Sequence, residues 1–313
     1  IYIFFLLSSF VIFRFGIIRS SRIGHFIANT EIYLAEKKMF AGSSKKYIDI
    51  ISFDNVSVSN LYLSKHYKKE IKIYPNLLVQ PFYNFINYFK KLKKFNVNTL
   101  GSNGDRDLNG YLYKVNHSFK FNSKFEIDKI NIGLKNLGLT EKSKFICLNV
   151  RDDAYLKKTY PRGDWNYHNY RNWDIKKFNK VSNSLTKRGY KVLRMGKIVK
   201  EKIDTSNPMI IDYANSSHRS DIMDIYLHTK SFFTATTGTG VDLGSYVSRV
   251  PMAWISVPVS GFYTFKNHFH VTKHHKNKKT GKKLTLSEIF SYGDPTKERF
   301  LENVTLEELS DIE

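Results

Sequence analysis

Cysteine is nearly absent from this chain, with one residue, Cys147, among 313. A single thiol cannot form a disulfide within the chain, and it excludes the zinc sites that are built from several cysteines. Cys147 lies in the apolar run of residues 145–150, where a small buried side chain is the expected role rather than a nucleophile. We therefore expect a protein of a reducing compartment whose chemistry does not depend on sulfur.

Proline and glycine are also scarce, with 7 and 17 residues, while 42% of the residues are hydrophobic and 15% are aromatic. This composition excludes collagen-like, linker-like and intrinsically disordered chains. A length of 313 residues, at about 150 residues per domain, indicates two domains with enough chain for a core in each.

Acidic residues are few. The chain has 28 Asp and Glu but 50 Lys and Arg, which gives a formal net charge of +22. Such a field attracts phosphate groups, anionic lipid or nucleic acid. Lys, Asn, Ile, Phe and Tyr are abundant together, as in the product of an AT-rich gene, so the charge alone does not identify the partner. The basic residues are dispersed and no known nucleic-acid-binding motif is present, so nucleic acid is not the expected partner.

The first 13 residues are almost wholly apolar. They are too short to span a bilayer, and they lack the basic start and the cleavage site of a signal peptide. They are either the end of a clipped membrane anchor or an interfacial helix that leads into a first strand, and we favour the second. Together with the basic segment 84–94 and the net charge, they predict a cytoplasmic protein attached peripherally to the anionic inner face of the membrane.

Strand and helix patterns alternate along the chain, which predicts an α/β fold with parallel sheets. In the first half we expect strands at 11–18, 47–53 and 71–74 and helices at 26–34, 58–67, 77–95 and 125–137. The pattern then restarts, with strands at 144–150, 190–195, 209–212, 231–236 and 252–257 and helices at 173–185, 221–229 and 241–247. The basic stretch 273–283 is expected to be a solvated loop. We therefore expect, after the apolar segment 1–13, two Rossmann-like domains, residues 14–139 and 140–313, that face each other across a cleft.

Polar residues directly after the predicted strands are the candidates for a site, since ligands of open α/β sheets bind at the carboxyl ends of the strands. Glycine allows close approach of the backbone, and arginines and the N–H groups that open a helix suit a diphosphate. Arg151 and Arg194 could each equally form a salt bridge at the end of the strand that precedes it. The Gly/Thr loop is neither a Walker sequence nor a complete G-x-G-x-x-G. The donor-binding candidates are Arg151, Arg194, Gly196, Asp212, Thr236, Thr237, Gly238, Thr239 and Gly240.

In the first half, His25 follows the first predicted strand and could act as a general base near neutral pH. Arg22, Gly24 and Asn29 lie close to it in the sequence. A cap or packing contact at the start of the helix is the alternative role for His25. In the second half, Tyr170 and Arg171 belong to an aromatic and basic stretch, 164–173, which suits stacking on a base or a sugar, or could be a surface flap packed on its own rings.

These motifs, in this order, resemble a family of bacterial glycosyltransferases associated with surface-polysaccharide and lipopolysaccharide-type gene clusters. The resemblance spans residues 14–260 and is carried by Arg22-Ile-Gly-His25, Arg151-Asp-Asp153, His168-Asn-Tyr-Arg-Asn172, Arg194-Met-Gly196, Asp212-Tyr-Ala, Ser220-Asp-Ile-Met-Asp224 and the loop from Thr236 to Gly240. The second half is also similar in layout to fucosyltransferases with two Rossmann domains, in which an arginine at the position of Arg151 meets the nucleotide diphosphate.

The resemblance implies a GT-B architecture, with an acceptor half first and a nucleotide-sugar half second. It implies transfer of a sugar from a nucleotide donor to a glycan or lipid-linked acceptor, without a bound metal and with no cofactor besides the donor itself, since basic groups stabilise the departing diphosphate. Two alternatives stay open. One is a polysaccharide pyruvyl transferase that uses phosphoenolpyruvate, and the other is a non-catalytic protein that binds anions or nucleic acid.

Overall fold

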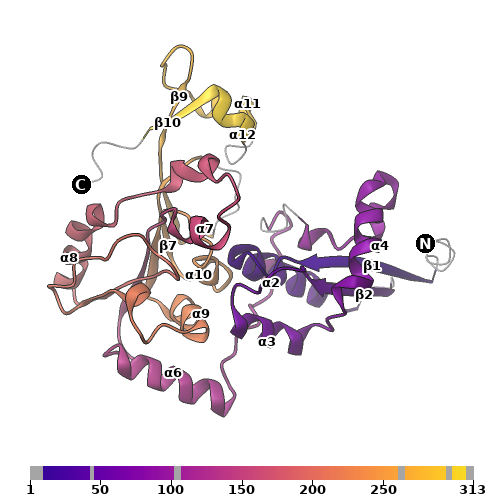
Figure 1. The fold of residues 1–313 in the computed structure, drawn as a ribbon, viewed down its shortest axis with the longest axis horizontal. Coiled ribbons are helices and arrows are strands. Elements are labelled where there is room, and N and C mark those ends of the chain that lie inside the picture. The colour runs from indigo at the N-terminus through magenta and orange to yellow at the C-terminus, as the bar shows by residue number, and fades with distance from the viewer. Residues whose placement is uncertain (1–9, 43–45, 102–106, 260–264, 294–297, 308–313) are drawn as a thin grey trace. The chain divides into compact units, whose positions relative to one another are not determined.

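The computed structural model describes residues 10–42, 46–101, 107–259, 265–293 and 298–307 (Figure 1). The chain divides into two compact units, Ile1–Ser123 and Lys124–Glu313. The division falls before helix α6 (Lys124–Asn136) rather than after it, where the sequence pattern placed it. The reason is that α6 packs against α9 (Asp221–Lys230), with Gly133 so close that a Cβ there would lie 2.6 Å from the sulfur of Met223.

The first unit is built on two parallel strands, β1 (Val11–Ile18) and β2 (Lys46–Phe53). Helix α2 (Ile23–Met39) connects them. Isolated parallel bridges from Ile51 to Ile73 and from Phe15 to Asn96 extend the pairing on both sides. The strand predicted at 11–18 is confirmed, so the end of the apolar segment 1–13 belongs to β1, while residues 1–9 lie outside the described part of the chain.

The remaining elements of the first unit are α3 (Leu61–Glu70), α4 (Asn76–Tyr88), η1 (Lys90–Phe95), η2 (Asn98–Leu100) and α5 (Tyr111–Lys114). Asn60 caps α3, because its Oδ1 accepts a hydrogen bond from the Leu63 amide at 2.9 Å. The single helix predicted at 77–95 is wrong, since the chain breaks at Phe89 into α4 and the 3₁₀ segment η1. Lysines crowded at 90, 91, 93 and 94 repel one another on a continuous helix, which favours this break.

A half-buried ion network joins the three main elements of the first unit. In β1, Arg14 donates from Nε and Nη2 to the two carboxylate oxygens of Asp49 in β2 at 2.7 and 2.9 Å. It also donates from Nη1 to Glu36 in α2 at 2.9 Å. Burial lowers the pKa of Arg14, but the two carboxylates outweigh burial and raise that pKa overall. The network therefore fixes β1, β2 and α2 to one another through one guanidinium group.

The second unit contains a six-stranded parallel sheet in the order β5-β4-β3-β6-β7-β8. The first strand of this unit, β3, lies in the middle of the sheet. The next two strands along the chain, β4 and β5, lie on one side of it, and the last three, β6, β7 and β8, lie on the other. This is the order of a doubly wound nucleotide-binding sheet, and its switch point lies between β3 and β6. The strands are β3 (Phe145–Asn149), β4 (Lys191–Arg194), β5 (Ile210–Ile211), β6 (Phe233–Thr236), β7 (Met252–Val257) and β8 (His268–Thr272).

Helices cover this sheet, and those predicted at 125–137, 221–229 and 241–247 are confirmed. Ser220 caps α9, with its hydroxyl accepting from the Met223 amide at 3.4 Å. The helix predicted at 173–185 instead consists of a 3₁₀ turn, η4 (Ile175–Phe178), followed by α8 (Asn179–Lys187). The stretch predicted as a polar flap contains η3 (Asn166–Arg171). The other short elements are α7 (Ala154–Thr159), η5 (Tyr213–Asn215) and α10 (Leu243–Val247).

The basic stretch 273–283 differs from the expected solvated loop. Its residues His274–Asn277 form β9, which pairs antiparallel with β10 (Val304–Glu307). Lys273 and His275 are buried as a result, with 4% and 3% of their surface exposed. The centre of the Trp173 ring lies 5.4 Å from the Lys273 ammonium, and the ring of Phe300 of α12 (Glu298–Asn303) lies 6.2 Å from the His275 ring, after α11 (Leu286–Ser291) in the chain. These partners are distant in the sequence, so a local charge pattern could not reveal the burial.

No helix among the described residues combines the length and the hydrophobicity that crossing a membrane requires.

Replacing Arg14 with Ala should destabilise the first unit by about 3 kcal/mol, because it leaves Asp49 and Glu36 as uncompensated, largely buried carboxylates. Hydrogen exchange of the β1 and β2 amides in the full chain measures this loss. The exposed residue Lys114 provides the control, since Lys114→Ala should leave the exchange unchanged. Exchange in Arg14→Ala equal to that of the parent would contradict the role of the network.

Candidate functional site

The switch point between β3 and β6 brings together two loops that are far apart in the sequence. The Thr237 amide donates to the carbonyl of Asn149 at 3.0 Å. In return, the Arg151 amide donates to the Thr237 hydroxyl at 2.9 Å. These bonds extend the strand pairing by one step and fix residues 150–153 against residues 237–240. Crevices at such positions are where ligands of open α/β sheets bind.

Two arginines, Arg151 and Arg171, lie together at this point. Arg171 Nη1 donates to the Gly238 carbonyl at 3.4 Å, and Arg151 Nη1 donates to the side-chain oxygen of Asn172. Burial, followed by the charge of Arg171, lowers the pKa of Arg151 to about 10. Arg151 therefore keeps its charge at neutral pH, and an anion at this position would relieve the repulsion between the two cations. Arg171, expected on the acceptor or flap side, lies beside Arg151 and the Gly/Thr loop.

The Gly/Thr loop differs from the expected diphosphate cradle in one respect. The Gly238 amide donates to the Thr236 hydroxyl at 2.9 Å, and the Thr239 amide donates to the Asp242 carboxylate at 2.8 Å. These two amides are used inside the loop, and Asp242 places a carboxylate before the start of α10. These two amides are therefore not available to an anion, whereas the guanidinium groups of Arg151 and Arg171 lie beside the loop. Gly238 has a φ of 87°, which side-chain-bearing residues rarely adopt.

Arg194 and Asp212 are placed in an internal cluster. Arg194 has no exposed surface, and its guanidinium lies 3.7 Å from Asp152 Oδ2 and 3.7 Å from Asp212 Oδ1. Burial lowers the pKa of Arg194 and the two carboxylates oppose that shift. Asp152 also accepts from the Lys200 amide at 2.8 Å, and Asp212 accepts from Asn215 Nδ2 at 2.8 Å. The cluster holds together the loops after β3, β4 and β5.

Gly196, in the same region, has a φ of 149°, and a Cβ there would lie 2.5 Å from Val199 Cγ1. A backbone requirement therefore accounts for this glycine. Arg194, Asp212 and Gly196 shape the loops around the site, while Arg151 and Arg171 lie beside each other.

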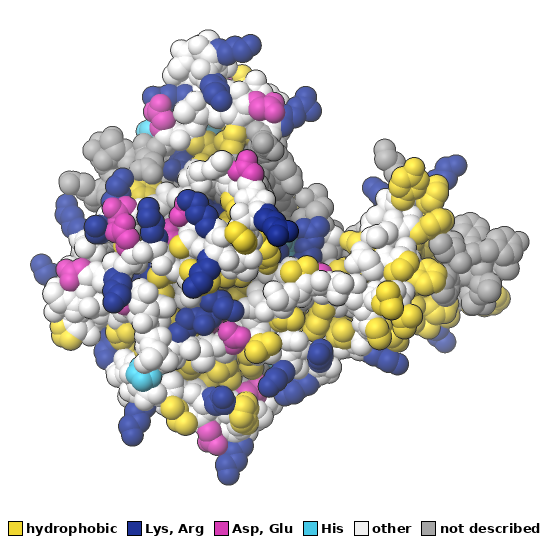
Figure 2. All heavy atoms as spheres, in the orientation of Figure 1, with side chains coloured by type: hydrophobic (Ala, Val, Ile, Leu, Met, Phe, Trp, Pro, Cys, Tyr) yellow, Lys and Arg dark blue, Asp and Glu magenta, His cyan; other side chains and the backbone are white. Residues whose placement is uncertain are grey.

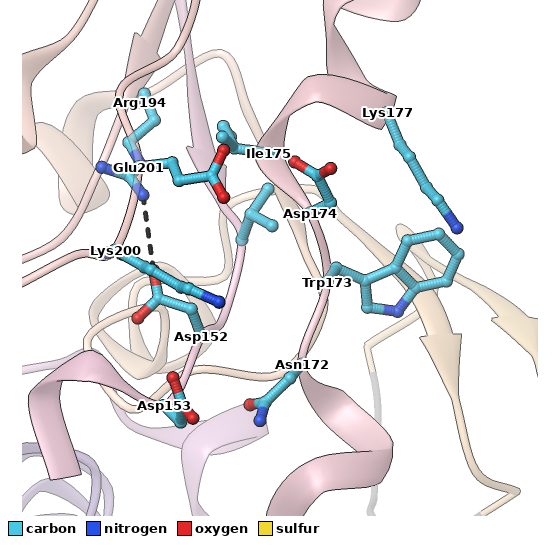
Figure 3. Close-up of a pocket in the computed structure, with 11 residues that line it drawn as sticks. Asp152, Asp153, Asn172, Trp173, Asp174, Ile175, Lys177, Arg194, Lys200 and Glu201 are labelled. Carbon is cyan, nitrogen blue, oxygen red and sulfur yellow. Dashed lines mark hydrogen bonds and ion pairs between the residues drawn. The ribbon is translucent and has the colours of Figure 1, made fainter. Parts of the chain in front are cut away.

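A pocket of about 320 Å³ lies at the carboxyl ends of β3 and β4. Figure 3 shows Asp152, Glu201 and Lys200 at one side of it, with Trp173 and Lys177 opposite. The Lys177 ammonium lies 4.9 Å from the centre of the Trp173 ring. Asn172 lines the pocket and also accepts the hydrogen bond from Arg151, so the pocket adjoins the arginine pair.

The sequence analysis did not assign Asn172, Trp173 or Glu201 to a site. Trp173 is the last residue of the aromatic stretch 164–173, so the sequence analysis could have assigned it to the site. Asn172 lies in the same stretch and carried the same signal, whereas Glu201 carried none, because its place depends on how the loops after β3 and β4 meet. The rest of the aromatic stretch packs partly on itself, since Trp165 Nε1 donates to the Tyr160 carbonyl at 3.0 Å. Tyr170 lies beside Arg171, with 5.6 Å between its ring centre and the guanidinium carbon.

His25 lies in the first unit, in the first turn of α2 rather than in the loop before it. Asn29 Nδ2 donates to the Gly101 carbonyl at 2.9 Å, which turns Asn29 Oδ1 toward His25 Nδ1 at 3.3 Å. An amide oxygen only accepts, so Nδ1 carries the proton and the lone pair is on Nε2. This is the tautomer that a general base requires. Arg22 is the N-cap residue of α2, and Gly24 precedes His25 in its first turn.

The turn before His25 is held by the loop after β2. The hydroxyl of Ser20 donates to Asp54 at 2.7 Å, and the hydroxyl of Ser21 donates to the second oxygen of the same carboxylate. Ser59 donates back to the Ser20 carbonyl through its amide at 2.9 Å. These hydrogen bonds fix the turn at the carboxyl end of β1. Helix α2 begins directly after this turn, with Arg22 as its N-cap residue, and carries Gly24, His25 and Asn29.

Among the residues that the structure describes, no three or more His, Cys, Asp or Glu side chains gather as metal ligands would.

No protein-family model and no curated protein matches the sequence. A search of solved structures finds the glycosyl transferase family 9 protein from Veillonella parvula DSM 2008, with a TM-score of 0.46 and 10% sequence identity. The match covers 83% of this chain and 85% of that chain. A likeness at this level does not carry chemistry from one protein to the other.

Replacing Arg194 with Met should lower the stability of the second unit by about 3–5 kcal/mol, because Asp152 and Asp212 would stay buried without their cation. Denaturant unfolding followed by tryptophan fluorescence measures the loss. Adding Asp212→Asn to the same variant should restore part of the stability, since it removes one of the two orphaned charges. A variant Arg194→Met that unfolds like the parent would contradict the structural role.

Proposed function

We propose that the chain is a glycosyltransferase of the GT-B type, which transfers a sugar from a nucleoside-diphosphate donor to a hydroxyl group of a glycan or lipid-linked acceptor in bacterial surface polysaccharide synthesis. The observation that carries the proposal is the pair Arg151 and Arg171 at the switch point of the six-stranded sheet. Two guanidinium groups that repel each other at a carboxyl-end crevice suit a ligand with two phosphate groups.

The pocket beside the arginine pair supports a nucleoside as the second part of the donor. Its lining includes the carboxylates of Asp152, Asp153, Asp174 and Glu201, which disfavour a phosphate but accept hydrogen bonds from ribose hydroxyls and base N–H groups. The ring of Trp173 adds an apolar wall. The donor would then lie with its diphosphate at Arg151 and Arg171 and its nucleoside toward Glu201.

His25 would act as the general base of an inverting transfer. Nε2 takes the proton of the acceptor hydroxyl as that oxygen attacks the anomeric carbon of the donor sugar. The bond from the anomeric carbon to the diphosphate breaks, and the electron pair leaves with the phosphate. The additional negative charge is then stabilised by Arg151 and Arg171. The acceptor half and the donor half of the reaction belong to different units of the chain.

A phosphoenolpyruvate-dependent pyruvyl transferase is the main alternative, because its substrate also carries anionic groups that an arginine pair would bind. Phosphoenolpyruvate has no ribose or base, so that reaction would leave the pocket beside Asn172 and Glu201 without a role. A non-catalytic anion-binding protein is a further alternative. Such a protein would need neither the pocket beside Asn172 and Glu201 nor a His25 ring with its proton on Nδ1.

The first test uses thermal unfolding of the full chain with UDP, GDP, dTDP, CMP and phosphoenolpyruvate. One nucleoside diphosphate, at about 100 times its dissociation constant, should add about 2.7 kcal/mol of stability. Arg151→Met and Arg171→Met should each weaken its binding by about 10-fold to 100-fold, because each removes a charged hydrogen-bond donor.

The exposed residue Lys158 supplies the matched control, since Lys158→Met removes a positive charge from the same unit away from the arginine pair. It should bind the nucleotide like the parent. Stabilisation by phosphoenolpyruvate alone, or unchanged nucleotide affinity in both arginine variants, would exclude the proposed donor site.

The second test concerns His25. His25→Ala should lower the turnover of sugar transfer by about 100-fold to 10,000-fold, the usual contribution of a general base. Its unfolding midpoint and its affinity for the nucleotide should stay at the parent values. His218, an exposed histidine, provides the control, and His218→Ala should transfer sugar at the parent rate. Parent-like turnover in His25→Ala, or a product that retains the anomeric configuration of the donor, would overturn this assignment.

A further inference from the structure

Helix α4 in the first unit presents two apolar faces, and the described residues bury only one of them; at the edge of the other, the ring of Phe82 stacks on that of Phe15, with 5.2 Å between the ring centres. Val79 and Ile86 point into the core beside Phe15 of β1. The outward side carries a second series of large apolar residues, which we name the α4 stripe. Its members are Leu77, Leu78, Phe82, Phe85, Tyr88 and Phe89. The most exposed are Leu77 and Tyr88, with 84% and 82% of their surface accessible.

The spacing of these residues makes the stripe continuous. Positions 77, 78, 82, 85, 88 and 89 recur every three to four residues, so they line one side of the helix. Phe85 and Phe89 have ring centres 4.9 Å apart, as do Tyr88 and Phe89. Figure 2 shows apolar side chains gathered over α4. Contiguous exposed apolar surface of this kind marks an interaction site rather than an ordinary protein surface.

Charge distinguishes the stripe further. No charged residue occurs from Asn76 to Tyr88, and the lysines at 90, 91, 93 and 94 follow directly. Lys91, Lys93 and Lys94 are exposed. No acidic residue occurs anywhere from 76 to 95. The surface thus combines an uncharged aromatic band with a purely cationic end.

We propose that the α4 stripe is a membrane-docking surface, which inserts its apolar side chains into the interfacial layer of a bilayer that contains anionic lipid. Leucine and aromatic side chains gain free energy at the boundary between headgroups and acyl chains. Lysines next to them attract anionic headgroups, at about 1 kcal/mol for each lysine near the surface. The inference stands on α4 and η1 alone and does not depend on the transferase activity.

A bilayer fits this surface better than a second copy of the chain. A two-fold contact through the α4 stripe would bring the lysines at 91, 93 and 94 of both copies to one interface, and their repulsion would oppose it. An anionic membrane neutralises the same charges. Docking by α4 would also hold the first unit, which contains His25, at the leaflet where a lipid-linked acceptor would reside.

The test uses the full chain with vesicles of phosphatidylcholine, with and without phosphatidylglycerol. All three native tryptophans, Trp165, Trp173 and Trp254, lie in the second unit, so a Tyr88→Trp variant reports on α4. Its emission should shift to shorter wavelength and be quenched by brominated lipid on the anionic vesicles. Phe125→Trp, at a residue of α6 that is 64% exposed, is the matched control and should give neither change.

Co-sedimentation then measures the binding itself. Leu77→Ser with Phe85→Ser and Tyr88→Ser should weaken vesicle binding by about 100-fold, because three apolar side chains no longer enter the interface. Phe125→Ser with Ile132→Ser, which removes exposed apolar residues from α6, should bind like the parent. Lys91→Gln with Lys93→Gln and Lys94→Gln should remove the preference for anionic vesicles. Circular dichroism checks that every variant is folded.

Several results would overturn the inference. One is vesicle binding that the triple serine variant retains in full. Another is equal binding of the parent to neutral and anionic vesicles at every salt concentration. A third is a Tyr88→Trp emission that responds to protein concentration and not to vesicles, which would assign the α4 stripe to self-association.

Discussion

The pairing of β3 with β6 is the contact on which the candidate site depends. It joins residues 146–149 to residues 233–236, and it continues beyond the strands through the bonds that link Asn149, Arg151 and Thr237. Beneath it, the buried His228 contacts the Asp224 carbonyl through Nδ1 at 2.6 Å and Asn149 through Nε2 at 3.1 Å. Burial lowers the pKa of His228, and the contacts of its two ring nitrogens join α9 to the end of β3.

Electrostatic compensation separates the arginines that hold the structure from those that suit a ligand. Arg194 lies between two carboxylates in a closed cluster, and Arg14 has a similar environment in the first unit. Arg151 and Arg171 instead lie beside each other, with bonds to the neutral oxygens of Asn172 and Gly238, and the effect of Arg171 on the pKa of Arg151 is larger than that of either nearby carboxylate, Asp152 or Asp153. Like charges held together cost free energy, and a bound anion recovers it. We therefore assign the anion site to this pair.

Local patterns located strands β1 to β7 and several helices, while strands β8, β9 and β10 were not predicted. The run of β-branched and aromatic residues at 11–18 coincides with β1, and Ser220 caps α9 as its sequence context predicts. The alternation of elements also indicated parallel sheets. The sheet order could not be read locally, because the crossover from β5 to β6 depends on which strands pair across 20 or more residues.

Long-range contacts account for the parts of the site that the sequence left open. Arg171 belongs with Arg151 because a 3₁₀ turn returns the chain to Gly238. The Gly238 amide donates to the Thr236 hydroxyl, and the Thr239 amide donates to Asp242, which folds back on the loop. The boundary between the units lies before α6, and not after it as predicted, because Gly133 of α6 packs closely against Met223 of α9. None of these contacts has a signature in the composition or the spacing of the residues.

Hydrogen–deuterium exchange of the full chain, with and without the nucleoside diphosphate that stabilises it, tests the central claim directly. Binding at the switch point predicts slower exchange in residues 150–153, 169–175 and 237–240, which surround the arginine pair and the pocket. Exchange in α3 of the first unit should be unchanged. Slower exchange confined to the first unit, or no change in residues 150–153 and 237–240 while the nucleotide is bound, would contradict the assignment of the donor site.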